Sequence, residues 1–131
     1  MIVVDASAMT ELLLQTPLGS RVEARLVRDG DDLHAPHLLD AEVAQALRRL
    51  VRIGEVTAAR AGEAIEDLIL FDVFRHPHVD LLVRAWQLRD NLTAYDAVYV
   101  ALAEALDAAL VTCDAPLGAA PGHAAPIEVV A

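Results

Sequence analysis

The chain of 131 residues has no lysine, and its ten basic residues are all arginines, set against twenty acidic residues. Its formal net charge is −10 at neutral pH. Proteins that hold nucleic acid through counterion release alone carry a basic surface, so this composition excludes that class. If the chain binds a polynucleotide, divalent metal or the few arginines must supply the positive charge, because the planar guanidinium suits bidentate phosphate contacts. An acidic surface also suits a basic protein partner.

Cysteine is nearly absent, since Cys113 is the only one. A single thiol forms no internal disulfide and no thiolate metal site, which excludes disulfide scaffolds and zinc fingers. Long apolar runs are absent as well, because every run falls far short of the ~20 residues that cross a bilayer. The first residues, MIVVDASAM, include an acid where a secretory signal has basic residues. We therefore expect a cytoplasmic protein.

Predicted strands and helices alternate along the chain. Hydrophobic residues make up 56% of it and no repeat divides it, so we expect a single domain over residues 1–131. Short apolar runs predict strands at 2–4, 33–35, 72–74, 109–112 and 127–130. Helical spacing of apolar positions predicts helices at 7–14, 17–28, 38–53, 57–70, 81–89 and 93–106. This alternation favours an α/β fold with a mostly parallel central sheet of four to five strands flanked by helices.

Acidic residues follow two of the predicted apolar strands. Asp5 comes directly after the first strand, and Asp114 comes after the strand that ends at Thr112. Ligands of open α/β sheets bind beyond the carboxyl ends of the strands, so both acids are candidate site residues. Because side chains alternate, Thr112 shares a face with Asp114, whereas Cys113 points the other way and packs as a small apolar residue. Ser7 is placed to cap a helix or to orient a carboxylate.

Two further acids, Glu42 and Asp96, lie near the starts of predicted helices. Each has a simpler interpretation. Asp96 follows Thr93 by three residues, which is the spacing of a capping box, and Glu42 alone fits a solvated helix face. Asp40 competes with Glu42, and we assign the helix cap to Asp40 because a short acid near a helix start is a good cap. Taken singly, these acids indicate helix starts as readily as a site.

The four acids mean more as a set. Carboxylates that converge without arginine partners repel each other by roughly 4 kcal/mol per pair at ~4 Å and an effective dielectric near ~20, a cost that bound cations relieve. Oxygen ligands select hard ions such as Mg²⁺ or Mn²⁺ over zinc. Two such ions ~3.5–4 Å apart can activate water and stabilise the leaving oxygen of a phosphodiester. The combination indicates metal-dependent phosphodiester chemistry.

Four segments, IVVDASA, LLDAEVAQALRRL, LTAYDAVYVALAEA and LVTCD, occur in this order over essentially the whole chain. Together they resemble the VapC-type toxins of the PIN-domain nuclease family. The resemblance implies a PIN-like three-layer α/β/α fold and an acidic quartet that holds Mg²⁺ or Mn²⁺, with two supporting hydroxyls. These residues are Asp5, Glu42, Asp96 and Asp114, with Ser7 and Thr112. It also gives the metal role to Glu42 rather than to Asp40.

The resemblance further implies an endoribonuclease that is the toxin of a type II toxin–antitoxin pair, with an RNA substrate, a VapB-type antitoxin and a homodimeric state. By hypothesis, Asp5, Asp96 and Asp114 ligate one ion, and Glu42 helps to hold a second ion or its water. An activated hydroxide then attacks phosphorus and leaves a 5′-phosphate and a 3′-hydroxyl. Two alternatives stay open: a PIN-type RNA-processing nuclease without an antitoxin, and a non-catalytic interaction module whose acids hold a structural ion. A haloacid-type phosphatase ranks last, because position 7 is serine where that chemistry usually has an acid.

One departure from the family concerns phosphate binding. Toxins of this type often carry basic residues just after the last acid, and residues 115–118 include none. Other arginines can make these contacts, and the sequence does not choose among Arg75, Arg84 and Arg89. A second group is expected on a solvated helix face with local ion pairs: Arg48, Arg49 and Arg52.

Apolar and aromatic residues outside the acidic pattern carry further expectations. Five residues offer more apolar surface than two short helices need, and we expect part of this surface to form a homodimer or antitoxin interface: Leu12, Leu13, Leu14, Val22 and Leu26. Tyr95 and Tyr99 have helical spacing, which favours core or interface packing over base stacking. His76 and His78 flank Pro77, a pattern more typical of a turn than of a metal site.

Overall fold

A five-stranded sheet forms the centre of the computed structural model, which describes residues Met1–Ala131. The strands are β1 (Ile2–Val4), β2 (Leu33–Pro36), β3 (Phe74–His76), β4 (Ala109–Thr112) and β5 (Ile127–Val129). All four neighbouring pairs are parallel, in the order β3-β2-β1-β4-β5. This order confirms the predicted α/β class with a parallel sheet of four to five strands.

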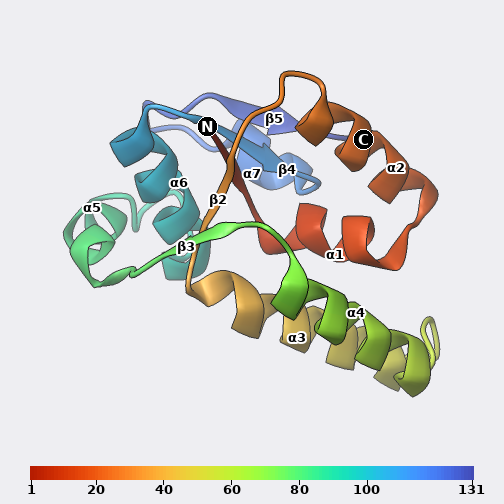
Figure 1. Ribbon diagram of the computed structural model, residues 1–131. Helices are drawn as coiled ribbons and strands as arrows, with labels where there is room; N and C mark the ends of the chain where they lie inside the picture. Colours follow the sequence, from red (N-terminus) through yellow and green to blue (C-terminus); the bar gives the residue numbers. More distant parts are fainter.

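Helices connect the strands and cover both faces of the sheet. They are α1 (Ala6–Leu14), α2 (Pro17–Val27), α3 (Leu38–Arg52), α4 (Ala58–Leu70), the short 3-10 helix η1 (Val79–Leu81), α5 (Leu82–Gln87), α6 (Ala94–Leu106) and α7 (Ala115–Ala119). Figure 1 shows α5 and α6 on one side of the sheet and α1 to α4 on the other. The three layers of the PIN-like architecture are therefore present. None of the helices combines the length and apolar character needed to cross a membrane.

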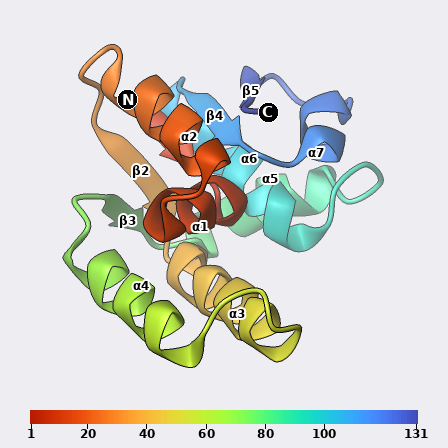
Figure 2. The ribbon, with the colours of Figure 1, turned by 90° about the vertical axis from the view of Figure 1, so that its right-hand side faces the viewer.

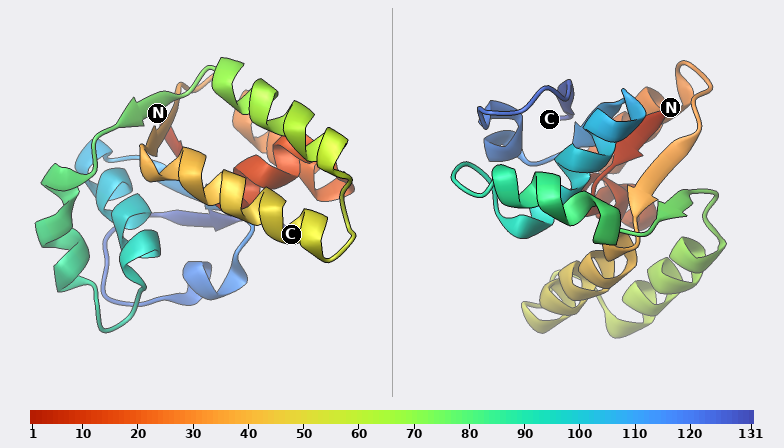
Figure 3. Two further views of the ribbon diagram at one scale, coloured as in Figure 1. Left: turned by 90° about the horizontal axis from the view of Figure 1, so that it is seen from below. Right: turned by 90° about the vertical axis from the view of Figure 1, so that its left-hand side faces the viewer.

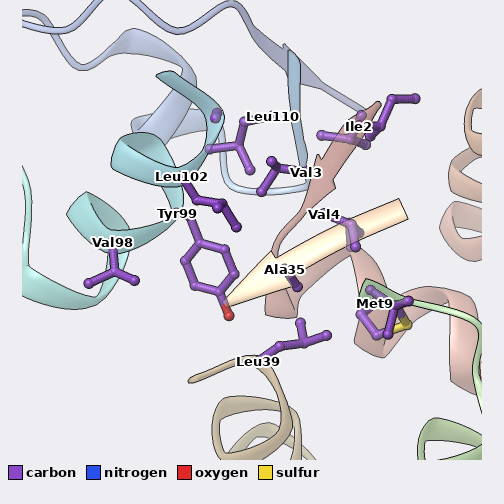
Figure 4. Close-up of a cluster of buried hydrophobic side chains, with 14 of the residues drawn as sticks. Ile2, Val3, Val4, Met9, Ala35, Leu39, Val98, Tyr99, Leu102 and Leu110 are labelled. Carbon is purple, nitrogen blue, oxygen red and sulfur yellow. The ribbon is translucent and has the colours of Figure 1, made fainter. Parts of the chain in front are cut away.

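The core fills the space between the sheet and both helical layers. Strand β1 is buried along its whole length, as expected for a central parallel strand covered on both faces. Its side chains alternate between the layers. Figure 4 shows Val3 beside Leu110 and Leu102 of α6, whereas Val4 lies toward Met9 of α1. The central strands are therefore held from two sides, and their carboxyl ends have a fixed position.

Three element boundaries differ from the sequence-based predictions. Strand β3 lies two residues later than predicted and includes His76, so this histidine belongs to the sheet edge rather than to a turn. The segment predicted as one helix at 81–89 divides into η1 and α5. The short helix α7 follows β4, where the hydrophobic pattern predicts no helix, because five residues are too few to show a period.

Two helix caps also differ. Helix α1 is capped by Asp5, which accepts the amide N–H of Ala8 at 3.0 Å, so Ser7 lies inside the helix instead of at its start. Helix α3 has no side-chain cap, and Asp40 pairs with Arg75 at 2.8 Å. The prediction that Asp40 caps α3 is wrong, because the ion pair across to β3 takes its carboxylate.

The apolar surface of α1 and α2 is used largely within the chain. Leu13 and Val22 are buried where α1 packs against α2, so these two residues serve the core of this chain, and Leu26 is buried there as well. Two short helices pack closely here because Gly19 lets their backbones approach. Leu12 and Leu14 are partly exposed, and Leu12 and Leu26 line a groove beside β2.

Candidate acidic metal centre

The carboxyl ends of β1 and β4 bring two of the four acids to one edge of the sheet. The strands are neighbours with Val4 opposite Val111, and the Asp5 amide continues the ladder to the Val111 carbonyl at 3.2 Å. Asp114 follows β4 at the same edge. Residues more than a hundred positions apart therefore meet where ligands of parallel sheets bind.

Asp5 is held firmly in a network of hydroxyl groups. It is 5% exposed. The Ser7 hydroxyl donates to its Oδ1 at 2.7 Å, and the Thr112 hydroxyl donates to its Oδ2. Burial raises the pKa of Asp5, the hydrogen bonds from Ala8, Thr112 and Ser7 oppose this rise, and the charge of Asp114 adds to it. The network fixes the orientation of the Asp5 carboxylate, and its hydrogen bonds partly offset the energetic cost of burying that group.

The same two hydroxyls position the turn that carries Asp114. The amide of Asp114 donates to Thr112 Oγ1 at 2.9 Å, and the amide of Cys113 donates to Ser7 Oγ at 3.0 Å. The Asp114 carboxylate makes no capping bond to α7 and lies partly exposed, so helix capping does not explain it. Cys113 packs partly buried against the core, and burial raises the pKa of its thiol to about 11.

Glu42 reaches the site from α3. Its Oε1 is buried without a hydrogen-bond partner, and so is the hydroxyl of Tyr99 on α6. Burial is the main cause that raises the pKa of Glu42, with repulsion from Asp96 and Asp5 adding to it, while the nearby Tyr99 hydroxyl lowers it. Figure 4 shows the Tyr99 hydroxyl directed toward Leu39 at the start of α3. The two groups face each other without a hydrogen bond of ordinary geometry.

Asp96 reaches the site from the first turn of α6. Thr93 caps this helix by accepting the Asp96 amide N–H at 3.2 Å. The return bond from the Thr93 amide to the Asp96 carboxylate does not form, so only half of the capping box exists. Burial raises the pKa of Asp96, and the charges of Asp114 and Asp5 raise it further. The Thr93 side chain opposes this rise, and the Asp96 carboxylate has no ion-pair partner.

The four carboxylates come from four separate segments and act on one another electrostatically. No arginine pairs with any of them. The acids in ion pairs all lie elsewhere: Asp29, Asp31, Asp40, Glu63, Glu104 and Glu128. The structure therefore gathers negative charge at this edge and supplies no protein cation to balance it.

The carboxylate oxygens of the four acids suit a hard cation, although the side chains are not arranged around a common point. The structure contains no group of three or more His, Cys, Asp or Glu side chains arranged to hold a metal ion. Both oxygens of Asp5 are turned to hydroxyl groups, and mutual repulsion keeps the carboxylates apart. The unpartnered, buried Oε1 of Glu42 is the observation that favours a cation, because buried polar atoms nearly always have a partner.

One residue of the site is missed by the sequence analysis. Tyr99 is in the core as predicted, at 1% exposed, but its hydroxyl faces Glu42. Its spacing of three residues from Asp96 places both on one helix face and is the signal that could have found it. Tyr95 is 60% exposed, so core packing within this chain is wrong for Tyr95.

The comparisons with known proteins agree with this fold. A model of the PIN domain matches residues 2–121. Ribonuclease VapC9 of Mycobacterium tuberculosis is 45% identical over 130 residues, which cover 99% of this chain and 98% of VapC9.

Solved structures show the same architecture. PAE2754 from Pyrobaculum aerophilum is 29% identical with a TM-score of 0.69, and the match covers 98% of this chain and 83% of PAE2754. VapBC2 from Rickettsia felis was crystallised bound to a DNA fragment from its promoter. One of its chains is 14% identical to this chain with a TM-score of 0.69, and the match covers 98% of both chains. This likeness shows the fold alone. This chain belongs to the PIN-domain family and, within it, to the VapC-type proteins.

Proposed function

We propose that this chain is a Mg²⁺-dependent endoribonuclease and the toxin of a type II toxin–antitoxin pair. The observation that carries the proposal is the electrostatic repulsion among Asp5, Glu42, Asp96 and Asp114, none of which has an arginine partner. A relative that covers nearly the whole chain, VapC9, is named a ribonuclease. Membership of the VapC-type proteins supports RNA as the substrate and a VapB-type antitoxin as the partner.

The acids divide into two roles toward the metal. Asp5, Asp96 and Asp114 would hold a first Mg²⁺ or Mn²⁺ ion, and Glu42 would hold a second ion or its water through the oxygen that has no partner now. When bound, such ions supply activation of water and stabilisation of the leaving oxygen of a phosphodiester. The expected products are a 5′-phosphate and a 3′-hydroxyl.

The surrounding hydroxyl groups keep these carboxylates charged and oriented. Ser7 and Thr112 donate to the two oxygens of Asp5, and hydrogen bonds to the charged form favour that form. Tyr99 has a pKa raised far above its usual value, mainly by burial, so its hydroxyl stays protonated and can donate to Glu42. These groups position the acids and take no proton from RNA.

The activity is tested by cleavage of a labelled RNA pool with Mg²⁺. We expect Asp96→Asn to lower the cleavage rate by about a hundredfold or more, because the substitution keeps the size and removes the charge that a catalytic cation needs. Asp90→Asn, an exposed acid shortly before α6, is the matched control and should cleave normally. Cleavage that survives EDTA, or Asp96→Asn protein that cleaves at the normal rate, would contradict the proposal.

The same assay separates the alternatives. A non-catalytic module would bind Mg²⁺ without cleaving any RNA. A processing nuclease without an antitoxin would cleave RNA and would have no inhibitory partner encoded beside it.

We also propose where the antitoxin binds. A groove of about 430 Å³ runs between α1, α2 and β2. Its apolar lining includes Leu12, Leu26 and Phe71, and its acidic lining includes Glu23, Asp31, Asp32 and Asp72. Apolar walls with acidic residues fit a basic segment that also carries apolar side chains. The antitoxin of this pair is expected to provide such a segment.

Charge reversal tests the groove. The double variant Glu23→Arg, Asp32→Arg should weaken antitoxin binding at least about tenfold, because rim charges now repel a basic partner. RNA cleavage by the free toxin should stay unchanged, since both residues lie away from the acidic site. Titration calorimetry with the purified antitoxin measures the affinity, and unchanged affinity would place the antitoxin elsewhere.

A homodimer is proposed for a different face. Val79, Leu82, Val83 and Trp86 are exposed on η1 and α5 at helical spacing and form one apolar strip. Two chains with a net charge of −10 each can meet only where acidic residues are sparse. We propose that the strip on η1 and α5 packs against its copy in a second chain.

A further inference from the structure

Six of the ten arginines are already engaged. Five pair with carboxylates: Arg25, Arg28, Arg60, Arg75 and Arg84. Arg89 lies 4.8 Å from the centre of the Trp86 ring and donates to the Trp86 carbonyl. All three arginines considered above for phosphate contact are among these six, and Arg75 and Arg84 would each have to leave an ion pair to reach RNA.

The other four arginines have neither a carboxylate partner nor an aromatic one, and three of them lie on α3. They are Arg21, Arg48, Arg49 and Arg52. The expectation that the three on α3 make local ion pairs is wrong. Their helix is the one that carries Glu42, so unpaired positive charge and the acidic site share one element.

A groove of about 440 Å³ extends from the acidic site along α3, between α1 and α3. Ser7, Glu42 and Cys113 line it beside the acids, and Gln45 and Arg49 line it further along. The α3 positions at 42, 45, 46, 49 and 50 form one face of the helix. Arg49 therefore stands two turns from Glu42, about 10 Å along the helix axis.

Arg48 and Arg52 face a different side of the same helix. They line the hollow between α3 and α4 together with Val51 and Ile65. Figures 2 and 3 show α3 lying alongside α4, and α1 packs against both helices. Of the three unpaired arginines on α3, only Arg49 lines the groove that begins at the acids.

We propose that this groove holds the RNA strand and that Arg49 binds the phosphate of a nucleotide next to the one that is cleaved. The inference rests on the proposed ribonuclease function. The groove contains Glu11 and Glu42, which repel a polyanion, so one unpaired guanidinium decides whether a phosphate can lie there. Arg21 adds positive charge from α2, where it acts to lower the pKa of Cys113.

The lining also indicates what part of RNA is recognised. None of the residues that line the groove is aromatic, so bases have no ring to stack on. A strand held here is bound through its backbone, and base preference arises outside this groove. Arg49 is accordingly a positioning residue for the substrate.

The test measures binding of a fluorescent single-stranded RNA of mixed sequence in Mg²⁺. All proteins carry Asp96→Asn so that the RNA stays intact. We expect Arg49→Ala to weaken binding about fivefold to tenfold and to make the plot of log Kd against log salt shallower by about 0.7, the value for one phosphate contact on a single strand. Arg48→Ala, with the same charge on the same helix, should change Kd less than about twofold. Arg49→Lys should recover part of the affinity because it keeps the charge and loses the planar fork.

Kinetics on the otherwise unchanged enzyme add a second readout. Arg49→Ala should raise KM with little change in kcat, since its contact lies away from the reacting phosphate. Melting temperatures equal to that of the parent show that each variant folds, as expected for an exposed side chain without a partner.

The outcomes separate this inference from the function on which it rests. Equal losses for Arg49→Ala and Arg48→Ala, or an unchanged salt slope for Arg49→Ala, would overturn the groove assignment. A parent enzyme that cleaves RNA while Arg49→Ala binds normally also overturns it and leaves the nuclease standing. A parent that never cleaves RNA, with binding that still depends on Arg49, refutes the nuclease and supports the groove.

Discussion

Asp5, Glu42 and Asp96 each have a pKa raised by burial first and by neighbouring acids after that. A raised pKa means that the folded state binds a proton more tightly than the unfolded chain does. Their contribution to stability is therefore fully present below their ordinary pKa, near pH ~4, and is lost as the pH rises through the raised values. Without metal, the site destabilises the protein at neutral pH.

Asp96→Asn tests this cost. The substitution removes one repelling charge, and we expect it to raise the free energy of unfolding at pH ~7 without metal by about 0.5–2 kcal/mol. The gain should shrink as the pH falls and vanish well below the ordinary pKa of about 3.9, where the carboxyl is protonated in both the folded and the unfolded chain. Added Mg²⁺ should raise the melting temperature of the parent more than that of the variant. Thermal unfolding followed by circular dichroism gives all three results, and a variant less stable than the parent at neutral pH would contradict the interpretation.

His34 on β2 shows a pKa shift of the opposite sign. Its Nδ1 lies 2.8 Å from Nε2 of His76, and its pKa is lowered mainly by burial and further by the charge of His76. Because the folded pKa is depressed, this residue contributes stability above its ordinary pKa of about 6.5 that is lost as the pH falls.

At the level of elements, the packing of α1 on α2 depends on one small residue. A Cβ atom added to Gly19 would stand 2.1 Å from the carbonyl oxygen of Glu11, which is backbone and cannot rotate away. The two helices would have to separate. This would move α1, whose N-cap is the site residue Asp5. The acidic site is thus sensitive to a contact at the opposite end of α1.

Gly19→Ala should lower the free energy of unfolding by about 1–3 kcal/mol, the usual cost of overpacking. Gly62→Ala is the matched control, because Gly62 lies in α4 with open space around it. The control should be neutral or stabilising by up to about 1 kcal/mol, since alanine is the better helix former. Urea denaturation of the three proteins measures the difference, and equal stabilities would show that α1 and α2 can separate without cost.

On the scale of the whole molecule, acidic side chains and exposed apolar side chains gather on different faces. The acidic groove beside β2 and the apolar strip on η1 and α5 are separate faces, which suits one basic partner and one identical partner. Trp86 is 68% exposed and is the largest side chain in the strip. Large aromatic residues dominate the energy of interfaces when they become buried.

Trp86→Glu should convert the proposed homodimer to a monomer, because it removes the apolar anchor and places like charges opposite each other. Ile53→Glu, at an exposed position beyond the end of α3, is the control and should stay dimeric. Light scattering after gel filtration reports the mass. A parent that is monomeric at high concentration would refute the interface.

Local patterns were sufficient for most strands and most helices, whereas the choice of Glu42 over Asp40 came from the family resemblance. The runs at Ile2–Val4 and Ala109–Thr112 are apolar because central parallel strands are buried on both faces, and an acid directly after such a run must emerge at the sheet edge. The periodicity of buried positions and the ends of strands depend on residues that are close in the sequence. Both can therefore be predicted without the tertiary structure.

Contacts between distant segments could be decided only by the fold. Whether Asp40 caps α3 or pairs with Arg75, and whether Tyr99 faces Glu42, depends on how separate elements pack. The same holds for Arg49, which makes no ion pair in the folded chain. Pairing is a competition in three dimensions, and its outcome is not contained in the spacing of residues along the chain.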